Sequence, residues 1–341
     1  MRIGILTGGG DAPGCNAVIR AAVRKGILNY GYEMFGIRDG WQGLLTGEVS
    51  KLTLNDISGI LPKGGTILGT SRTNPFKKDG GPEKVLENIK RYGLDCLIAI
   101  GGDDTLSVAQ RLHEMGIKVV GVPKTIDNDL ACTDYTFGFD TAVSIVAEAL
   151  DRLHTTAESH HRVLVVEVMG RYTGWIALFG GLAGGADFIL IPEKPASIEE
   201  ICDAIKKREE RGKTFSIIVV AEGVKINGQE VAQTKTKDEF GHVRLGGIGY
   251  YLAEKIEEKT GLETRAIVLG HLQRGGTPTA YDRILATRFG IAAIDLVHEG
   301  KFGTMPVLQG DDIVTVPIKD AIANRKPADL RLYDIAKIFF G

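Results

Sequence analysis

Residues 3–29 read IGILTGGGDAPGCNAVIRAAVRKGILN, and this stretch indicates the fold class of the chain. A short apolar run, Ile3–Leu6, passes through a glycine-rich turn, Thr7–Gly14, into a helix-length amphipathic segment, Ala17–Asn29. Glycines let the backbone approach a ligand closely, and a helix N-terminus offers unpaired N–H groups to a phosphate. The glycine spacing matches neither a dinucleotide-binding fingerprint nor a Walker A sequence, so a tight structural turn is an open alternative for this motif.

Apolar runs and helix-length segments alternate along the rest of the chain. The apolar runs have the composition of buried strands and are Leu97–Ile100, Lys118–Val122, Val163–Val168, Ser216–Val220 and Ala266–Leu269. The amphipathic segments between them are Glu83–Tyr92, Leu106–Met115, Thr141–Thr156 and Ile198–Arg211. Strands that alternate with helices predict βαβ units and a parallel sheet, in which ligands bind beyond the carboxyl ends of the strands. The polar segment Lys225–Gly247 is instead typical of a surface excursion.

Bulk composition narrows the class of protein. The 341 residues, 43% hydrophobic and 25% charged, are enough for two domains. A formal net charge of -2 argues against a nucleic-acid or anionic-membrane partner, and no apolar run approaches the roughly 20 residues of a membrane helix. The N-terminal residues leave no room for a signal peptide before the glycine-rich turn. The four cysteines form no CxxC pair, which disfavours a zinc site and a disulfide framework and favours the cytoplasm; they are Cys15, Cys96, Cys132 and Cys202.

The second loop at a predicted strand end carries two adjacent carboxylates, Asp103 and Asp104, after a pair of glycines. Adjacent carboxylates repel each other unless a cation lies beside them. Oxygen ligands at such a position suit Mg²⁺, which commonly binds one or two carboxylates and completes its shell with waters and substrate phosphates. The structural alternative is that Asp104 caps the helix that follows.

The third loop, Pro123–Asp129, again follows a predicted strand directly. Lys124 supplies a positive charge for phosphate, and a neighbouring aspartate could accept a hydroxyl proton during phosphoryl transfer. Three loops suited to phosphate at successive strand ends favour a phosphate-binding site over a set of ordinary turns.

These loops, with two later motifs, resemble the 6-phosphofructokinase family along nearly the whole chain. The motifs are Gly-Gly-Asp-Ala-Pro-Gly at 9–14, Gly-Gly-Asp at 101–103, Thr-Ile-Asp-Asn-Asp at 125–129, Met-Gly-Arg at 169–171 and Gly-His-Leu-Gln-Arg-Gly-Gly at 270–276. The resemblance implies an α/β fold of two Rossmann-like domains, with mainly parallel central sheets flanked by helices and an active site in the cleft between them. The larger domain, residues 1–138 and about 273–324, would bind pyrophosphate and magnesium, and the smaller one, residues 139–272 and about 325–341, would bind the sugar phosphate.

The resemblance also implies roles for individual residues near the reacting atoms. Asp127 would take the proton from the C1 hydroxyl of fructose 6-phosphate, and Thr125 would hydrogen-bond the same sugar. Asp103 would bind magnesium. Arg72 would face the transferred phosphoryl group, where a guanidinium neutralises developing charge, and Arg171 would assist it.

Further positions would recognise the sugar phosphate. Within one subunit these are Met169, Gly170, Arg171, Glu222, His271 and Arg274. Arg162 and Arg265 match residues that reach in from a neighbouring subunit, so the resemblance implies a homodimer or homotetramer. Guanidinium groups suit the 6-phosphate because their donors fork across its oxygens.

The phosphoryl donor depends on positions 104 and 124. The resemblance implies that ATP-using members typically have glycine at both, whereas aspartate and lysine typify the pyrophosphate-dependent branch. The Asp104 carboxylate would occupy the space, and oppose the charge, of an ATP α-phosphate. Gly10, Arg72, Asp104 and Lys124 would then bind pyrophosphate, and the readily reversible reaction would serve glycolysis and gluconeogenesis.

Three alternatives stand beside this interpretation. An ATP-dependent 6-phosphofructokinase keeps the fold and changes the donor. A noncatalytic regulatory subunit that binds sugar phosphate is more remote, because Asp103 and Asp127 are both present. A dinucleotide-dependent dehydrogenase would require the spaced glycine fingerprint that the first turn lacks.

Overall fold

The structure, a computed structural model, describes residues 1–226, 228–230, 232–237, 239–241 and 243–341. Two compact units share the chain. The larger unit contains residues 1–141, 239–241 and 274–325, and the smaller unit contains residues 142–238, 242–273 and 326–341. Each unit is therefore assembled from three segments that are distant in the sequence.

The larger unit contains a seven-stranded sheet in the order β15-β14-β5-β4-β1-β2-β3. The five central strands are parallel, and the strand at each edge is antiparallel to its neighbour. Every residue of β4 is buried, as expected of a parallel strand covered on both faces. The strands are β1 (Arg2–Thr7), β2 (Glu33–Ile37), β3 (Val49–Leu52), β4 (Cys96–Gly101), β5 (Val119–Pro123), β14 (Thr304–Gln309) and β15 (Asp312–Pro317).

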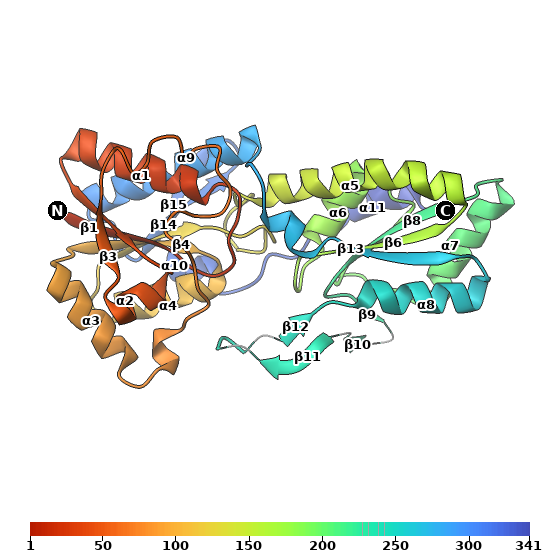
Figure 1. The fold of residues 1–341 in the computed structure, drawn as a ribbon, viewed down its shortest axis with the longest axis horizontal. Coiled ribbons are helices and arrows are strands. Elements are labelled where there is room, and N and C mark those ends of the chain that lie inside the picture. Colours follow the sequence, from red (N-terminus) through yellow and green to blue (C-terminus); the bar gives the residue numbers. More distant parts are fainter. Residues whose placement is uncertain (227, 231, 238, 242) are drawn as a thin grey trace. The chain divides into compact units, whose positions relative to one another are not determined.

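Helices cover both faces of this sheet (Figure 1). On one face α1 packs against α9, and on the other lie α3 and α4. Gly290 of α9 lies against α1, because a Cβ at this position would be 2.5 Å from the carbonyl oxygen of Val18. The helices are α1 (Cys15–Tyr30), α2 (Trp41–Thr46), α3 (Gly81–Tyr92), α4 (Asp103–Glu114), α9 (Ala280–His298), α10 (Ile318–Ala321) and the short 3-10 helix η1 (Pro75–Lys77).

The smaller unit contains a parallel four-stranded sheet in the order β13-β6-β8-β7. Its strands are β6 (Val163–Val168), β7 (Phe188–Leu190), β8 (Ser216–Ala221) and β13 (Thr264–Val268). The helices are α5 (Phe139–His160), which begins in the larger unit, α6 (Trp175–Ala183), α7 (Ile198–Glu210), α8 (Ile248–Thr260), α11 (Leu330–Ala336), and the 3-10 helices η2 (Gly270–Arg274) and η3 (Lys337–Phe339). Two reciprocal hydrogen bonds between Ser197 and Glu200 cap the start of α7.

The predicted surface excursion between residues 225 and 247 contains two small antiparallel ladders. They pair β9 (Lys225–Ile226) with β10 (Gln229–Glu230) and β11 (Ala232–Lys237) with β12 (Val243–Leu245). Residues 227, 231, 238 and 242 of this segment lie outside the described residues. Among the helices that the structure describes, none is long and apolar enough to cross a membrane.

The strands and helices expected from the sequence are present, with ends that differ by a few residues. The strand predicted at Ala266–Leu269 starts earlier, as β13, and the helix predicted at Thr141–Thr156 extends in both directions as α5. The mainly parallel sheets flanked by helices confirm the predicted α/β fold class.

We expect Gly290→Ala to destabilise the larger unit. The added methyl group would lie 2.5 Å from Val18 O and 2.9 Å from the Cβ of Ala21, so α1 and α9 would have to separate. Overpacking of this kind costs about 1–3 kcal/mol of unfolding free energy, measurable by chemical denaturation. Ile284→Ala on the same helix is the control, because Ile284 is 63% exposed and should change stability little. Equal effects of the two substitutions would contradict the packing argument.

Candidate active site

The first glycine-rich loop connects β1 to α1 in the larger unit. Gly9 and Gly14 adopt positive φ angles of 78° and 111°, which favour glycine. The N–H of Gly9 donates to Ser71 O at 3.0 Å, and the hydroxyl of Thr70 donates to Gly9 O at 2.6 Å. The segment that precedes Arg72 is therefore hydrogen-bonded to this loop, and Arg72 itself is exposed. The loop and the predicted arginine belong to one structural cluster.

Thr105 joins the first loop to the second. A Cβ added to Gly8 would lie 2.6 Å from the Thr105 hydroxyl oxygen, and one added to Gly101 would lie 2.3 Å from the Thr105 Cβ. Gly8 also donates its N–H to Ile100 O at 2.9 Å. Both glycines are therefore required by close packing around a buried threonine, in addition to any role in ligand approach.

Lys124 joins the third loop to the first. Its side chain is buried, and its ammonium group donates hydrogen bonds to the carbonyl oxygens of Gly8, at 2.9 Å, and Gly10. Burial, as the largest cause, and the nearby positive charge of Arg274 lower the pKa of Lys124 to about 8. Lys124 thus holds a positive charge against the backbone of the glycine-rich loop at neutral pH.

The Arg274 side chain packs against the same glycine-rich loop. Its Nη1 atom donates to Asp11 O at 3.1 Å, and a Cβ on Gly10 would come within 2.3 Å of that nitrogen. The guanidinium group therefore lies directly over Gly10. The resemblance implies that Arg274 binds the sugar phosphate, whereas its described contacts are with the glycine-rich loop of the larger unit.

Asp103 and Asp104 form the first turn of α4. Gly102 occupies the N-cap position, so the alternative in which Asp104 caps the helix is wrong. The Asp103 carboxylate accepts the backbone N–H of Asp104 at 2.9 Å. The dipole of the helix interacts favourably with negative side chains in its first turn.

The third loop is held by a network around buried Asn128. Asn128 has a positive φ of 51°, and its side-chain oxygen accepts the N–H of Thr136 at 3.0 Å. The Thr136 hydroxyl donates to Thr125 O at 2.6 Å, and the N–H of Asp127 donates to the Thr125 hydroxyl at 3.0 Å. The Asp127 side chain is 5% exposed. The proposed proton acceptor is thus held in a fixed loop next to the proposed sugar-binding threonine.

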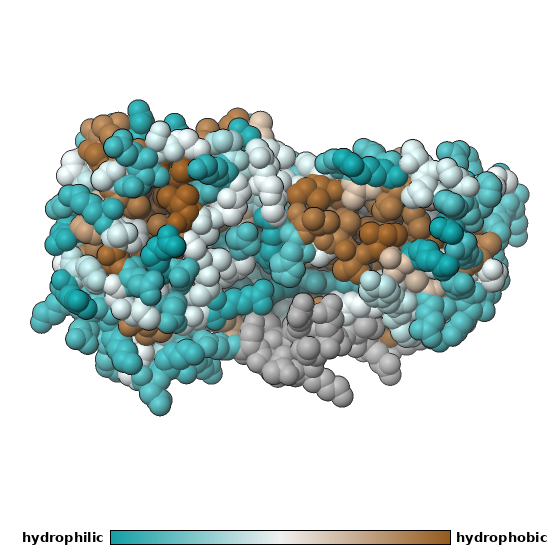
Figure 2. All heavy atoms as spheres, viewed as in Figure 1, coloured by the Kyte–Doolittle hydropathy of each residue, from teal (hydrophilic) through white to brown (hydrophobic). Residues whose placement is uncertain are grey.

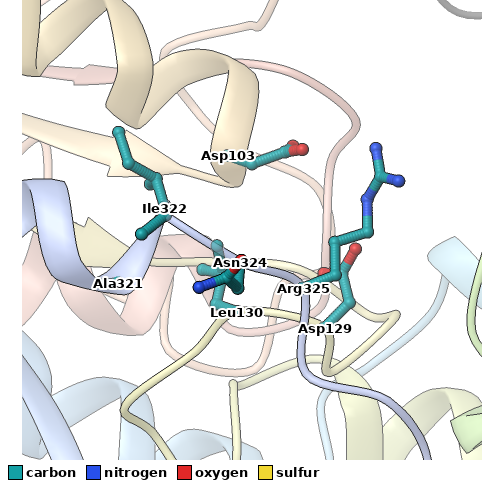
Figure 3. Close-up of a pocket in the computed structure, with 8 residues that line it drawn as sticks. Asp103, Asp129, Leu130, Ala321, Ile322, Asn324 and Arg325 are labelled. Atoms are coloured by element: carbon teal, nitrogen blue, oxygen red, sulfur yellow. The ribbon is translucent and has the colours of Figure 1, made fainter.

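A cavity of about 370 Å³ opens beside these loops within the larger unit. Its lining includes Asp103, Asp129 and the segment 321–325. Figure 3 shows Asp103 at the start of α4 on one side, and Asp129 and Arg325 on the other. Two carboxylates on one cavity are the ligand set that Mg²⁺ commonly takes from a protein, the remaining ligands being waters and phosphates. The described residues contain no group of three or more His, Cys, Asp or Glu side chains suited to a metal. A cation in this cavity would therefore need waters or phosphate oxygens as its other ligands.

In the smaller unit the Met-Gly-Arg motif follows the carboxyl end of β6. Gly170 and Arg171 have positive φ angles of 138° and 51°. The N–H of Arg171 donates to the Glu222 carboxylate at 3.1 Å, and the N–H of Met169 donates to the Gln273 side chain at 3.3 Å. The structure therefore brings together the residues at 169–171, Glu222 and the 270–273 motif, in which His271 is exposed.

Arg162 and Arg265 lie elsewhere in this unit. Both bind the carboxylate of Glu263, at 2.8 and 2.7 Å. Arg162 precedes β6, whereas Met169 follows it. At about 3.3 Å per strand residue, roughly 20 Å separate the two ends. These two arginines are thus far from the Met-Gly-Arg motif of their own unit.

Comparison with known proteins agrees with the motifs. The phosphofructokinase family model matches residues 2–297. The chain is 60% identical over 342 residues to pyrophosphate--fructose 6-phosphate 1-phosphotransferase of Amycolatopsis methanolica, with 100% of both chains covered. It is 53% identical over 327 residues to ATP-dependent 6-phosphofructokinase 3 of Streptomyces coelicolor, with 96% of both covered.

Solved structures give the same fold. A phosphofructokinase from Pichia pastoris in the T-state matches 99% of this chain with a TM-score of 0.83 and 35% identity, and the chain spans 38% of the yeast chain. A pyrophosphate-dependent phosphofructokinase from Nitrosospira multiformis, 22% identical, matches 100% of this chain and 92% of its own with a TM-score of 0.84, which supports the fold alone. From the family model and the full-length relatives, this chain is a phosphotransferase that belongs to the phosphofructokinase family.

Proposed function

We propose that this protein transfers a phosphoryl group reversibly from pyrophosphate to the C1 hydroxyl of fructose 6-phosphate, giving fructose 1,6-bisphosphate and phosphate. The observation that carries the choice of donor is the Asp104 carboxylate in the first turn of α4, beside the loops that hold Lys124 and Asp127. A carboxylate there opposes the additional phosphate of a nucleotide donor.

Overall identity to relatives supports this donor only weakly. Relatives named as pyrophosphate-dependent are 51–60% identical to this chain, and relatives named as ATP-dependent are 51–53% identical. The donor is therefore better argued from charge at the site. Lys124 and Arg274 place two positive charges at the glycine-rich loop, which suits a small and highly charged anion.

In the proposed reaction the C1 oxygen bonds to one phosphorus of pyrophosphate, the bond from that phosphorus to the bridging oxygen breaks, and orthophosphate leaves. Asp127 accepts the C1 hydroxyl proton, and Thr125 positions the sugar beside it. Arg72 and Arg171 stabilise the charge on the transferred phosphoryl group. Asp103 and Asp129 would hold Mg²⁺, which supplies positive charge to the phosphate oxygens when bound.

Sugar recognition is assigned to the smaller unit, through Met169, Gly170, Glu222 and His271, and through Arg274. Arg162 and Arg265 would serve the site of a neighbouring subunit in a homodimer or homotetramer. Their distance from the Met-Gly-Arg motif of their own chain supports this assignment.

The exposed side of the smaller unit also suits self-association. β13 is an edge strand of its sheet, and Val268 and Leu272 expose apolar side chains on and beside it. Figure 2 shows hydrophobic surface in this part of the unit.

The free state of the cysteines, three buried and one exposed, supports a cytoplasmic location.

The donor proposal predicts that the wild type forms fructose 1,6-bisphosphate with Mg²⁺ and pyrophosphate but not with ATP. Asp104→Gly should raise kcat/KM for ATP by about tenfold or more, because it removes both the volume and the charge that oppose the α-phosphate. Asp104→Asn is the matched control that removes charge and keeps volume. Product formed by the wild type mainly from ATP would overturn the donor, and no product from either donor would favour the regulatory-subunit alternative.

The depressed pKa of Lys124 predicts a pH dependence. The ammonium is largely charged at pH 7 and loses its proton as the pH rises through about 8. We therefore expect kcat/KM for pyrophosphate, measured at saturating fructose 6-phosphate, to fall by up to about tenfold per pH unit above that value. Lys124→Arg keeps a positive charge throughout this range and should lack this decline. If Lys124→Arg showed the same decline of kcat/KM with pH as the wild type, Lys124 would be excluded as the titrating group.

The shared-subunit assignment predicts complementation. Asp127→Asn and Arg265→Ala should each lower activity strongly as pure oligomers. In a hybrid purified with two different tags, one site would combine an intact Asp127 with the Arg265 of the other chain, so about half of the wild-type activity per dimer should return. A hybrid of Asp127→Asn and Asp103→Asn should show no such recovery, because both residues belong to one chain's site. Failure of the first hybrid would place Arg265 in its own chain's site or outside any site.

A further inference from the structure

The segment 321–325 follows α10 and forms one wall of the cavity that contains Asp103 and Asp129. No sequence motif assigns it a function. Its backbone is fixed to the end of the third loop, because Ala131 donates its N–H to Ala321 O at 3.1 Å and Leu130 pairs with Arg325 in an isolated antiparallel bridge. The bridge places Arg325 opposite the residue that follows Asp129.

The Arg325 side chain faces the same cavity as the two carboxylates. Figure 3 shows it extending from the loop beside Asp129, in the direction of the Asp103 carboxylate. Arg325 is exposed, so its guanidinium can be reached by a ligand from solvent. The cavity therefore carries the Asp103 carboxylate on one side, and the Asp129 carboxylate together with the Arg325 guanidinium on the other.

This combination of charges suits an anion that brings its own divalent cation. Carboxylates alone would repel a phosphate, but they bind Mg²⁺, and the phosphate oxygens complete the metal's shell. A guanidinium donates two parallel hydrogen bonds across phosphate oxygens, which a lysine does less specifically. A cavity of about 370 Å³ has room for a hydrated cation together with a phosphate group.

We propose that Arg325 is a further donor-binding residue, which binds a phosphate group of magnesium-bound pyrophosphate and, in the reverse reaction, orthophosphate. The proposal rests on the proposed function for the identity of the donor. It adds a contact from a segment about 200 residues beyond the third loop in the sequence. This segment lies on the side of the cavity opposite Asp103 of α4.

Arg325→Gln should weaken binding of pyrophosphate in the presence of Mg²⁺ by about tenfold or more, since charged hydrogen bonds of this kind are lost. Isothermal titration gives the dissociation constant without turnover, and steady-state kinetics should show a matching rise in KM for pyrophosphate with KM for fructose 6-phosphate unchanged. Arg325→Lys should recover part of the affinity. Arg331→Gln is the matched control, because Arg331 is an exposed arginine paired with Asp329 outside the cavity.

A pyrophosphate dissociation constant within about twofold of the wild type in Arg325→Gln would overturn the proposal, as would an equal loss of affinity in Arg331→Gln. These outcomes are distinguishable from failure of the proposed function. A wild type that binds and uses ATP but not pyrophosphate would overturn both the donor and the pyrophosphate contact. A wild type that uses pyrophosphate while Arg325→Gln binds it normally would overturn the role of Arg325 alone.

Discussion

The buried ammonium group of Lys124 is the interaction on which the rest of the candidate site depends. A buried charge is costly unless hydrogen bonds replace its water, and Lys124 finds them in the carbonyl oxygens of Gly8 and Gly10. Those carbonyls point at the lysine only because the glycine-rich loop takes a conformation that includes a positive φ at Gly9. The lysine therefore shapes the first loop while it keeps a positive charge next to it.

The order of the strands makes this interaction possible. β1, β4 and β5 are neighbours in one parallel sheet, so the loops at their carboxyl ends lie side by side. Thr105 fills the space between Gly8 and Gly101, and Lys124 spans from the third loop to the first. Packing and charge thus join the three loops into one rigid platform, in which moving one loop disturbs the other two.

The three loops of this platform could be predicted from the sequence because each signal is local: an apolar run followed directly by glycines or charged residues. The contact of Arg274 with the glycine-rich loop and the contribution of segment 321–325 could not be predicted, because they depend on where distant parts of the chain return to the sheet. The sequence analysis did not predict helix α9. Its inner face packs against α1, β5 and β14, but its exposed face also carries apolar side chains, Tyr281, Ile284 and Ile291, so the helix lacks the one-sided hydrophobic pattern that marks a surface helix. The capping alternative for Asp104 failed because α4 begins at Asp103, two residues earlier than a helix capped by Asp104 would begin.

The proposed donor rests on local charge at the site rather than on overall similarity to relatives. Relatives with different named donors differ in identity to this chain by only a few percentage points over nearly its whole length, so the residues that set the fold are shared by both groups. In the proposed function, the Asp104 carboxylate in the first turn of α4 opposes the additional phosphate of a nucleotide donor, while Lys124 and Arg274 keep their positive charges at the glycine-rich loop. A small, highly charged donor keeps its attraction to Lys124 and Arg274 and avoids the repulsion, whereas a nucleotide meets both. A single side chain can therefore change the donor while the platform that performs the transfer stays the same.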